Sequence, residues 1–303
     1  MVTDIMKLTG LHLLLTYRCT LECDHCFVYG SPWQNGVMTI QDVRQILQQA
    51  QSLGTVQSIY FEGGEPFLYY ATLVRAVDEA FRSGFQVGVV TNAYWATSLS
   101  DALLWLEPLA GRLSDLTVSS DLFHWSEADA RLAHNAQKAA ELLNIPAGTI
   151  EIAQPEKAEA VEGQLPLGQS GVMYRGRAAE ELAHQVTQSS WESFTTCPYE
   201  NLRDPGRLHV DPFGYVYICQ GISLGNLFQT PLRQILDGYD PERHPITGVL
   251  LQGGPAELSR RYNLPHAETY ADACHECDSL RRLLRERFPE ILAPAEIYGI
   301  TNS

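Results

Sequence analysis

Arg18-Cys-Thr-Leu-Glu-Cys-Asp-His-Cys-Phe27 is the stretch of this 303-residue chain on which its fold and chemistry depend. The three cysteines, Cys19, Cys23 and Cys26, have the spacing C-x3-C-x2-C on one short loop. Three thiolates placed this way can each bind one iron of a cubane iron–sulfur cluster, which takes four cysteines when fully ligated. The fourth iron then stays open, as a catalytic metal keeps a vacant position. The loop therefore predicts a cluster that can bind and reduce a ligand.

Zinc is an alternative to an iron–sulfur cluster at this loop. Zinc sites take Cys and His ligands in tetrahedral sets, and His25 could be the fourth ligand. His25 lies between two of the cysteines, however, where simultaneous ligation would be cramped. Disulfide bonds and buried apolar thiols are two more ways in which proteins use cysteine. An odd number of cysteines, 7 in clustered positions, favours metal ligation in a reducing compartment over disulfides. We therefore expect a cytoplasmic protein.

Charge and hydropathy argue against several classes of function. The chain has 21 Lys and Arg against 36 Asp and Glu, a formal charge of −15. This charge disfavours nucleic acid, whose binding depends on Lys and Arg at phosphates, and it disfavours an anionic membrane surface. The apolar run from Leu11 to Leu15 is too short to span a bilayer, and no signal peptide pattern is visible. We expect neither nucleic acid nor membrane as a partner.

Short apolar runs alternate with helical patterns over roughly the first 185 residues, which is typical of βα units around a parallel sheet. The pattern predicts strands over 11–16, 58–62, 85–90, 116–119, 149–153 and 172–174. It predicts helices between Thr39 and Gly54, over 73–81, after Ser126 and over 178–186. The fold class is therefore α/β, with six units in an open partial (β/α)6 barrel of the TIM type.

The sequence changes character from about Trp191, which indicates a small second domain. Residues 208–210 and 215–218 flank Asp211-Pro212-Phe213-Gly214, where Pro at the second and Gly at the fourth position fit a type I turn and predict a hairpin. On the last helix, four arginines predict a solvated basic face: Arg281, Arg282, Arg285 and Arg287.

Polar clusters follow the predicted strands at their carboxyl ends. They are Gly63-Gly64-Glu65-Pro66 after the second strand, Thr91-Asn92-Ala93 after the third, Ser119-Ser120-Asp121 after the fourth and Arg175-Gly176-Arg177-Ala178 after the sixth. In a parallel βα barrel these ends meet at one rim, where functional groups gather. We therefore expect these clusters and the cysteine loop to lie close together.

Together these motifs resemble those of radical S-adenosylmethionine (SAM) enzymes with a C-terminal twitch domain, the short relative of the SPASM domain. The resemblance extends from Leu11 to about Asp278. It implies a [4Fe–4S] cluster on the three loop cysteines, with SAM chelated at the open iron. His25 stands where the family often has an aromatic residue. The Gly-Gly-Glu-Pro motif is implied to hold the methionyl amino group, for which the Glu65 carboxylate is suited.

The resemblance also implies SAM contacts from Ser119 and Asp121, from Thr91 and Asn92, and from the backbone near Arg175. Plain turns and helix caps remain the alternatives for these segments. Asp121 and His124 are the candidate catalytic residues, with His124 as a base facing the substrate; an exposed loop histidine is the alternative. Tyr94 and Trp95 would pack on adenine or seal the rim.

A second set of cysteines resembles the twitch pattern for one auxiliary [4Fe–4S] cluster: Cys197, Cys219, Cys274 and Cys277. Three plus four ligands use every cysteine of the chain. A four-cysteine zinc site is the alternative. We expect residues 1–188 to form the barrel, and residues 189–303 to form a C-terminal iron–sulfur domain that contains the hairpin and helices.

The function implied is that of an oxidoreductase-like enzyme, which cleaves SAM reductively to a 5′-deoxyadenosyl radical that takes hydrogen from a substrate. The auxiliary cluster favours net oxidation or bond formation, and the electron would come from a partner such as flavodoxin or ferredoxin. A small-molecule substrate is favoured because the first strand begins by about Leu11, which leaves no room for an N-terminal leader-binding domain. The alternatives are maturation of a ribosomally made peptide and a non-catalytic iron–sulfur protein for electron transfer or redox sensing.

Overall fold

One mixed sheet forms the centre of the fold. The computed structural model describes residues 6–126, 130–154 and 169–300. Within these ranges nine strands join in the order β10-β9-β8-β1-β2-β3-β4-β5-β6. The first six are β1 (Gly10–Thr16), β2 (Ser58–Gly63), β3 (Gln86–Thr91), β4 (Asp115–Ser119), β5 (Ala147–Ile152) and β6 (Gln169–Ser170). Each neighbouring pair from β1 to β6 is parallel, which confirms the expected α/β fold with a parallel sheet.

The sixth strand differs from the prediction. Residues 172–174 form no strand, and β6 is a two-residue strand just before them. Val172 and Tyr174 instead bury their side chains in a small cluster with Ala178 and Leu182. Apolar composition identified a buried segment but not its backbone conformation, because packing against a neighbouring helix buries the same side chains as pairing in a sheet.

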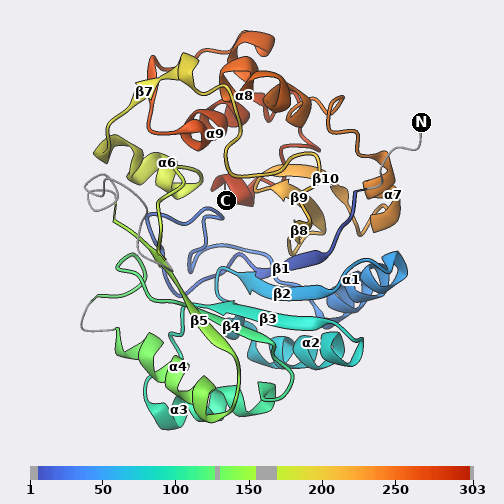
Figure 1. Ribbon diagram of the computed structural model, residues 1–303, viewed down its shortest axis with the longest axis vertical. Helices are drawn as coiled ribbons and strands as arrows, with labels where there is room; N and C mark the ends of the chain where they lie inside the picture. The colour runs from blue at the N-terminus through green and yellow to red at the C-terminus, as the bar shows by residue number, and fades with distance from the viewer. Residues whose placement is uncertain (1–5, 127–129, 155–168, 301–303) are drawn as a thin grey trace.

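Four helices cover the outer side of the parallel strands, as Figure 1 shows: α1 (Ile40–Leu53), α2 (Tyr70–Arg82), α3 (Leu99–Leu106) and α4 (Arg131–Leu142). α1 begins with a capping box between Thr39 and Asp42 and ends at Gly54 in the left-handed region, as its sequence predicts. α3 was not predicted; the Ser98 side chain caps it. The predicted helix start at Ser126 is followed by residues that lie outside the described ranges.

The C-terminal part extends the same sheet. The predicted hairpin is present as β8 (Arg207–Val210) and β9 (Tyr215–Cys219), and β10 (Ile222–Asn226) pairs with β9. β8 also pairs in parallel with β1, so the hairpin continues the sheet beyond its first strand. The helix predicted over 178–186 is the short α6 (Arg177–Glu181), followed by a 3-10 turn at Ala183–Gln185.

The remaining elements lie at the other end of the molecule from α3 and α4 (Figure 1). They are α8 (Thr247–Tyr262), which is kinked at Gly253 and Gly254, α9 (Ala273–Leu284), and a two-stranded pair of β7 (Ser189–Ser190) and β11 (Thr269–Tyr270). α7 (Leu232–Gly238) packs near α1 and β10. Within the described ranges, none of the helices combines the length and the apolar composition needed to cross a bilayer.

A buried polar contact joins the first strand to the hairpin. The hydroxyls of Tyr17 and Tyr217 both donate to the Asp211 carboxylate, at 2.9 and 2.7 Å. All three residues are fully buried, where a polar group is stable only when it is hydrogen-bonded. Because Tyr17 follows β1 directly and lies two residues before Cys19, this contact fixes the start of the cysteine loop against the C-terminal part of the chain.

Candidate functional site

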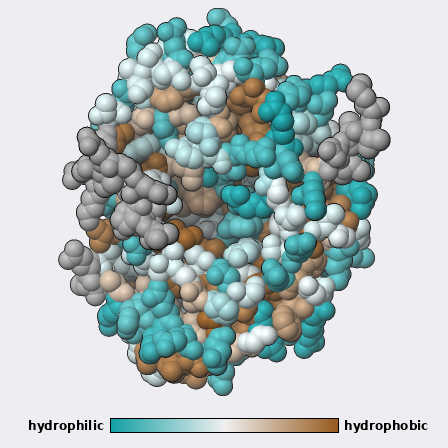
Figure 2. Space-filling view, viewed as in Figure 1, coloured by the Kyte–Doolittle hydropathy of each residue, from teal (hydrophilic) through white to brown (hydrophobic). Residues whose placement is uncertain are grey.

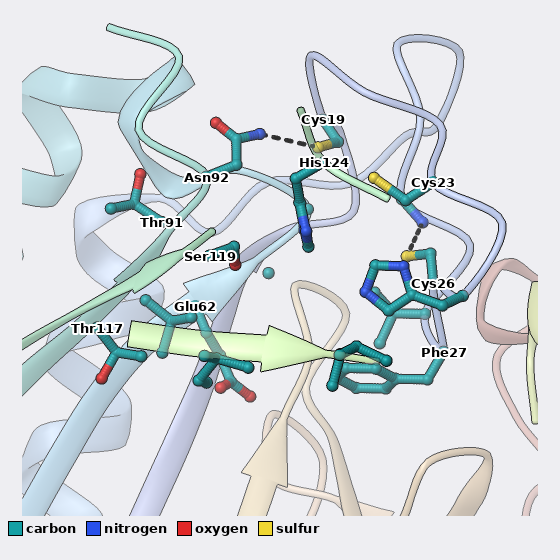
Figure 3. Close-up of a pocket in the computed structure, with 18 of the residues that line it drawn as sticks. Cys19, Cys23, Cys26, Phe27, Glu62, Thr91, Asn92, Thr117, Ser119 and His124 are labelled. Carbon is teal, nitrogen blue, oxygen red and sulfur yellow. Dashed lines mark hydrogen bonds between the residues drawn. The ribbon is translucent and has the colours of Figure 1, made fainter. Parts of the chain in front are cut away.

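A pocket of about 550 Å³ opens along the inner face and carboxyl ends of the parallel strands. It is visible as a hollow near the middle of the face in Figure 2. Residues from every predicted cluster line it: Cys19, Cys23, Cys26, Gly63, Gly64, Thr91, Asn92, Ser119, Asp121, His124 and Arg175. Parallel strands present their carboxyl ends at one edge, so these segments meet as the strand order predicts. Figure 3 shows the three cysteines on one side of the pocket and Thr91 and Glu62 on the other.

The cysteine loop presents sulfurs that already receive hydrogen bonds. The amide of Gly30 donates to the Cys26 sulfur at 3.2 Å, and the amide of Leu21 donates to Cys19 at 3.4 Å. The side chain of Asn92 lies 3.6 Å from the Cys19 sulfur, the contact drawn in Figure 3. Donors aimed at sulfur stabilise thiolates, and hydrogen bonds to sulfur help to set the reduction potential of iron–sulfur clusters.

The chemistry of this donor set fits an iron–sulfur cluster. Burial raises the pKa of Cys19 to about 12 and also raises that of Cys23, and the other loop cysteines add to both effects. Crowded, buried thiols resist ionisation unless a cation shares the site, and a bound metal deprotonates its thiol ligands. The seven cysteines all lie within the described ranges, and each is free of a disulfide.

Arg177 holds the cysteine loop in place, a role that the sequence did not reveal. Its guanidinium donates to the carbonyl of Cys23 at 2.7 Å and to that of Gly30 at 3.0 Å. Its amide donates to the carbonyl of Cys26 at 2.9 Å. The side chain is almost fully buried. The segment after the sixth strand therefore acts on the cysteines through Arg177.

Gly64 brings the second polar cluster against the cysteine loop. A Cβ atom at Gly64 would lie 2.3 Å from the carbonyl oxygen of Arg18, so only glycine fits there. Gly63 has a similar limit, because its Cβ would lie 2.3 Å from the carbonyl oxygen of Thr16. The paired glycines thus permit close backbone approach, as expected for this motif.

Glu65 has a different position from the one expected. It is fully buried and does not line the pocket. Its carboxylate accepts hydrogen bonds from the amides of Phe67 and Asn92 and from the hydroxyl of Thr91, at 2.8 to 3.0 Å. Burial outweighs these bonds and raises its pKa to about 7. These hydrogen bonds make Glu65 a link between the end of β2 and the end of β3. Pro66 follows it as the buried first residue of a 3-10 turn.

Thr91 and Asn92 link Glu65 to the cysteines. The Thr91 hydroxyl also accepts the Trp95 indole N–H at 3.1 Å, so Trp95 is a buried support and does not face the pocket. The Asn92 amide reaches both Cys19 and the hydroxyl of Thr20, the latter at 3.1 Å. Ser119, at the end of β4, is buried and lines the same pocket.

Asp121 and His124 are hydrogen-bonded to each other in the pocket wall, with 2.7 Å between the carboxylate and Nδ1. His124 is only 16% exposed, so it is not the exposed loop histidine considered as an alternative. Asp121 is buried, which opposes ionisation, but its bond with His124 keeps its pKa below the usual range. Its oxygens also accept the amides of Phe123, His124 and Ile152. The His25 ring packs beside His124, 4.9 Å away, and burial lowers the pKa of His25 to about 4.

Arg175 points toward the second set of cysteines. Its guanidinium lies 3.3 Å from the Cys219 sulfur and 3.6 Å from Glu200, and it stacks over the ring of Phe27. It lines both the main pocket and a second, smaller one. The side chain therefore lies between the two cysteine sets, where the sequence had indicated only backbone contacts near adenine.

The second, smaller pocket is lined by Cys197, Cys219, Cys274 and Cys277. Cys274 and Cys277 belong to the start of α9, and Cys219 ends β9. Burial raises the pKa values of Cys197, Cys274 and Cys277. This donor set fits a metal cluster for the same reason as the first.

Arg281 does not belong to a solvated basic face on the last helix, contrary to the prediction from its sequence. It is 2% exposed and donates to the carbonyl of Gln220 at 2.6 Å, close to Cys219 and Cys277. Arg282 and Arg285 are also only partly exposed, while Arg287, which lies beyond the end of α9, is exposed as expected. α9 packs one face on the rest of the protein, so arginines on that face become buried.

Comparisons of the sequence with known proteins each cover about a third of the chain. Residues 13–120 match the family model described as Radical SAM superfamily. The chain is 28% identical over 111 residues to the "Putative peptide biosynthesis protein YydG" of Bacillus subtilis (strain 168), covering 36% of this chain and 35% of that protein. It is 28% identical over 81 residues to the "S-adenosylmethionine-dependent nucleotide dehydratase" of Selenomonas ruminantium, covering 27% and 28%. The similarity thus spans about a third of these relatives.

The fold as a whole is shared with a solved structure. "Native anSMEcpe with bound AdoMet" aligns over 94% of this chain and 98% of that one, with a TM-score of 0.51 and 13% identity. At this identity the likeness concerns the fold alone.

Proposed function

From the radical SAM superfamily match of residues 13–120, we propose that this protein is an enzyme that cleaves SAM reductively and takes hydrogen from a substrate. One observation carries the proposal. The three loop cysteines open onto the same 550 Å³ pocket as the polar ends of β2, β3 and β4. A pocket of this size accommodates a cofactor and a compact group, since ligand sites commonly have about 300–1,000 Å³.

We assign the first [4Fe–4S] cluster to Cys19, Cys23 and Cys26. When bound, the cluster and SAM supply a one-electron reduction that breaks a carbon–sulfur bond and leads to removal of hydrogen from a substrate carbon. The protein binds and orients these groups and excludes water. Gly63 and Gly64 offer backbone without side chains at the pocket wall, while Ser119 and Asn92 offer polar groups.

Asp121 and His124 are assigned as the polar pair nearest the substrate. Asp121 orients the His124 ring through its Nδ1, which leaves the other ring nitrogen as a proton acceptor or donor toward the pocket. Proton transfer at that nitrogen is the step we attribute to this chain's own side chains.

An auxiliary [4Fe–4S] cluster is assigned to Cys197, Cys219, Cys274 and Cys277. Two buried cations lie beside this set, Arg175 and Arg281, and they offset the negative charge of four thiolates. An auxiliary cluster would accept an electron from the substrate side, so net oxidation or bond formation is the reaction type we propose. Electrons for the first cluster would come from a carrier such as flavodoxin or ferredoxin.

Two substrate classes follow from different observations. The pocket volume of about 550 Å³ favours a small molecule. Similarity to a protein named as a putative peptide biosynthesis protein favours modification of a peptide, of which one side chain would enter the pocket. Deuterium transfer from labelled candidates into 5′-deoxyadenosine distinguishes these classes, because only the true substrate delivers its label.

Iron content tests the assignment of both clusters. Anaerobically reconstituted protein should hold about eight irons per chain, the number for two cubanes. The Cys274→Ala variant should hold about four, retain SAM cleavage and form no product. If wild-type protein holds about four irons, or if the variant forms product at the wild-type rate, the auxiliary cluster is not part of the function. A colourless, zinc-loaded protein would exclude the whole proposal.

A further inference from the structure

Three polar residues on neighbouring strands lie on the inner face of the sheet, beside the pocket but away from the cysteines. His12 is on β1, Glu62 on β2 and His209 on β8. His12 and His209 are each flanked by buried apolar residues in their own strand, and they are partners in register. Glu62 lies two residues after Tyr60, the partner of His12, so all three side chains are on one face.

The three side chains converge on one point. Nδ1 of His12 lies 3.2 Å from one Glu62 oxygen, and Nε2 of His209 lies 3.3 Å from the other. One ligand atom from each residue can be chosen so that all lie within 4.8 Å of one another. Ligands bound about 2.1 Å from a zinc-like ion are themselves about 3.4 Å apart in a tetrahedral site, so small side-chain adjustments would bring the three into coordination.

Among the described residues, two polar atoms of this cluster have no hydrogen-bond partner. The Glu62 oxygen near His209 is buried without a hydrogen-bond partner, and so is Nδ1 of His209. His209 is only 7% exposed. A buried polar atom without a partner destabilises the folded protein. A cation bound at Glu62 would give its carboxylate oxygen a partner and so remove that destabilisation.

His25, Asp121 and His124 form a second cluster with a similar spacing, but we do not interpret it as a metal site. The Asp121 oxygens already accept three backbone amides as well as His124. Among the described residues, no equivalent set of backbone donors surrounds Glu62.

We propose that His12, Glu62 and His209 form a binding site for a divalent first-row transition metal ion, separate from both cysteine sets. Two histidines and one carboxylate are the ligands of catalytic zinc sites and of non-haem iron(II) sites that keep open positions. His12 and Glu62 line the main pocket, so those open positions face it. A substrate with a carboxylate, hydroxyl or amine donor would bind there. This use as a substrate anchor rests on the proposed function, whereas the metal site does not.

Titration with Mn²⁺, followed by the loss of the free-ion EPR signal, tests the site on anaerobic protein that carries its clusters. Mn²⁺ suits the test because it prefers oxygen and nitrogen ligands to thiolates. The wild type should bind one Mn²⁺ per chain. Glu62→Gln keeps the shape of the side chain and should weaken binding at least about tenfold, because even the loss of an outer-shell partner of a ligand costs about 10–100-fold in metal affinity. His12→Asn should do the same.

Asp115→Asn is the matched control, because Asp115 lines the same pocket and its replacement removes the same charge. It should bind Mn²⁺ as the wild type does. The inference is overturned if the wild type shows no saturable Mn²⁺ site, if Glu62→Gln binds equally well, or if Asp115→Asn weakens binding as much. SAM cleavage is measured on the same samples: Mn²⁺ binding without cleavage sinks the proposed function alone, and cleavage without Mn²⁺ binding sinks the metal site alone.

Discussion

Replacing Arg177 with methionine should release the cysteine loop from the body of the protein. The guanidinium joins the middle of that loop to the segment just after it, since it donates to the carbonyls of Cys23 and Gly30. These partners are 154 and 147 residues away in sequence, so the side chain is a long-range clamp. Methionine fills similar space but donates no hydrogen bond.

The magnitude follows from the two bonds. A hydrogen bond from a charged group contributes about 1.5–3 kcal/mol, so two contribute about 3–6 kcal/mol. The Cys23 carbonyl also accepts the Cys26 amide at 3.0 Å and keeps that partner in the variant. We therefore expect the lower part of the range, about 3–4 kcal/mol. At about 1.4 kcal/mol per factor of ten, the ordered loop becomes roughly two to three powers of ten less populated.

The assay is alkylation of cysteines after anaerobic reconstitution, resolved by peptide mass spectrometry. In Arg177→Met, the loop cysteines should become reactive, while Cys197, Cys219, Cys274 and Cys277 stay protected. Arg203→Met is the control, because Arg203 pairs with Glu242 at 2.7 Å but both are largely exposed, and such pairs contribute little. Loop cysteines as protected in Arg177→Met as in the wild type would refute the clamp.

Two further predictions concern backbone packing and pH. Gly64→Ala should remove the first cluster and SAM cleavage, because its Cβ would lie 2.3 Å from the backbone oxygen of Arg18. Gly148→Ala is the control and should retain both, because a Cβ there would have no atom within 4 Å. Equal iron contents in the two variants would contradict this prediction. Lowering the pH from 7.5 to 5.5 should destabilise the wild type by about 1 kcal/mol through His244, because burial lowers its pKa from 6.5 to about 4 and the unfolded chain binds the proton first. Stability from this group is present above pH 6.5 and is lost toward pH 4. Between pH 7.5 and 5.5, the Tm of His244→Asn should fall by about 2 °C less than the Tm of the wild type. An equal fall in both proteins would disprove the assignment to His244.

The sequence alone was sufficient for features that depend on neighbouring residues. The cysteine loop, the capping box at Thr39 and the hairpin around Asp211 are local patterns, and each lies where the pattern predicts. The meeting of the polar clusters in one pocket followed from strand order, because parallel strands end at a common edge.

Roles that depend on contacts between distant segments could not be predicted in this way. Glu65 was expected to face a ligand, but its depth in the protein was set by Thr91 and Asn92 on the next strand. Arg281 was expected in solvent because nothing in its own helix shows which face packs. The pairing of β8 with β1, which brings His209 to His12, joins segments almost two hundred residues apart. One signal was available: His12 and His209 each interrupt an apolar strand.

The central claim is that the three loop cysteines hold a cluster whose open iron acts on SAM. Its most direct test is the formation of 5′-deoxyadenosine from SAM and dithionite without oxygen, measured for the wild type and for Cys26→Ala at equal protein concentration. We predict formation by the wild type and none by the variant. Formation by Cys26→Ala at the wild-type rate, or no formation by wild-type protein that carries its full iron, would contradict the account.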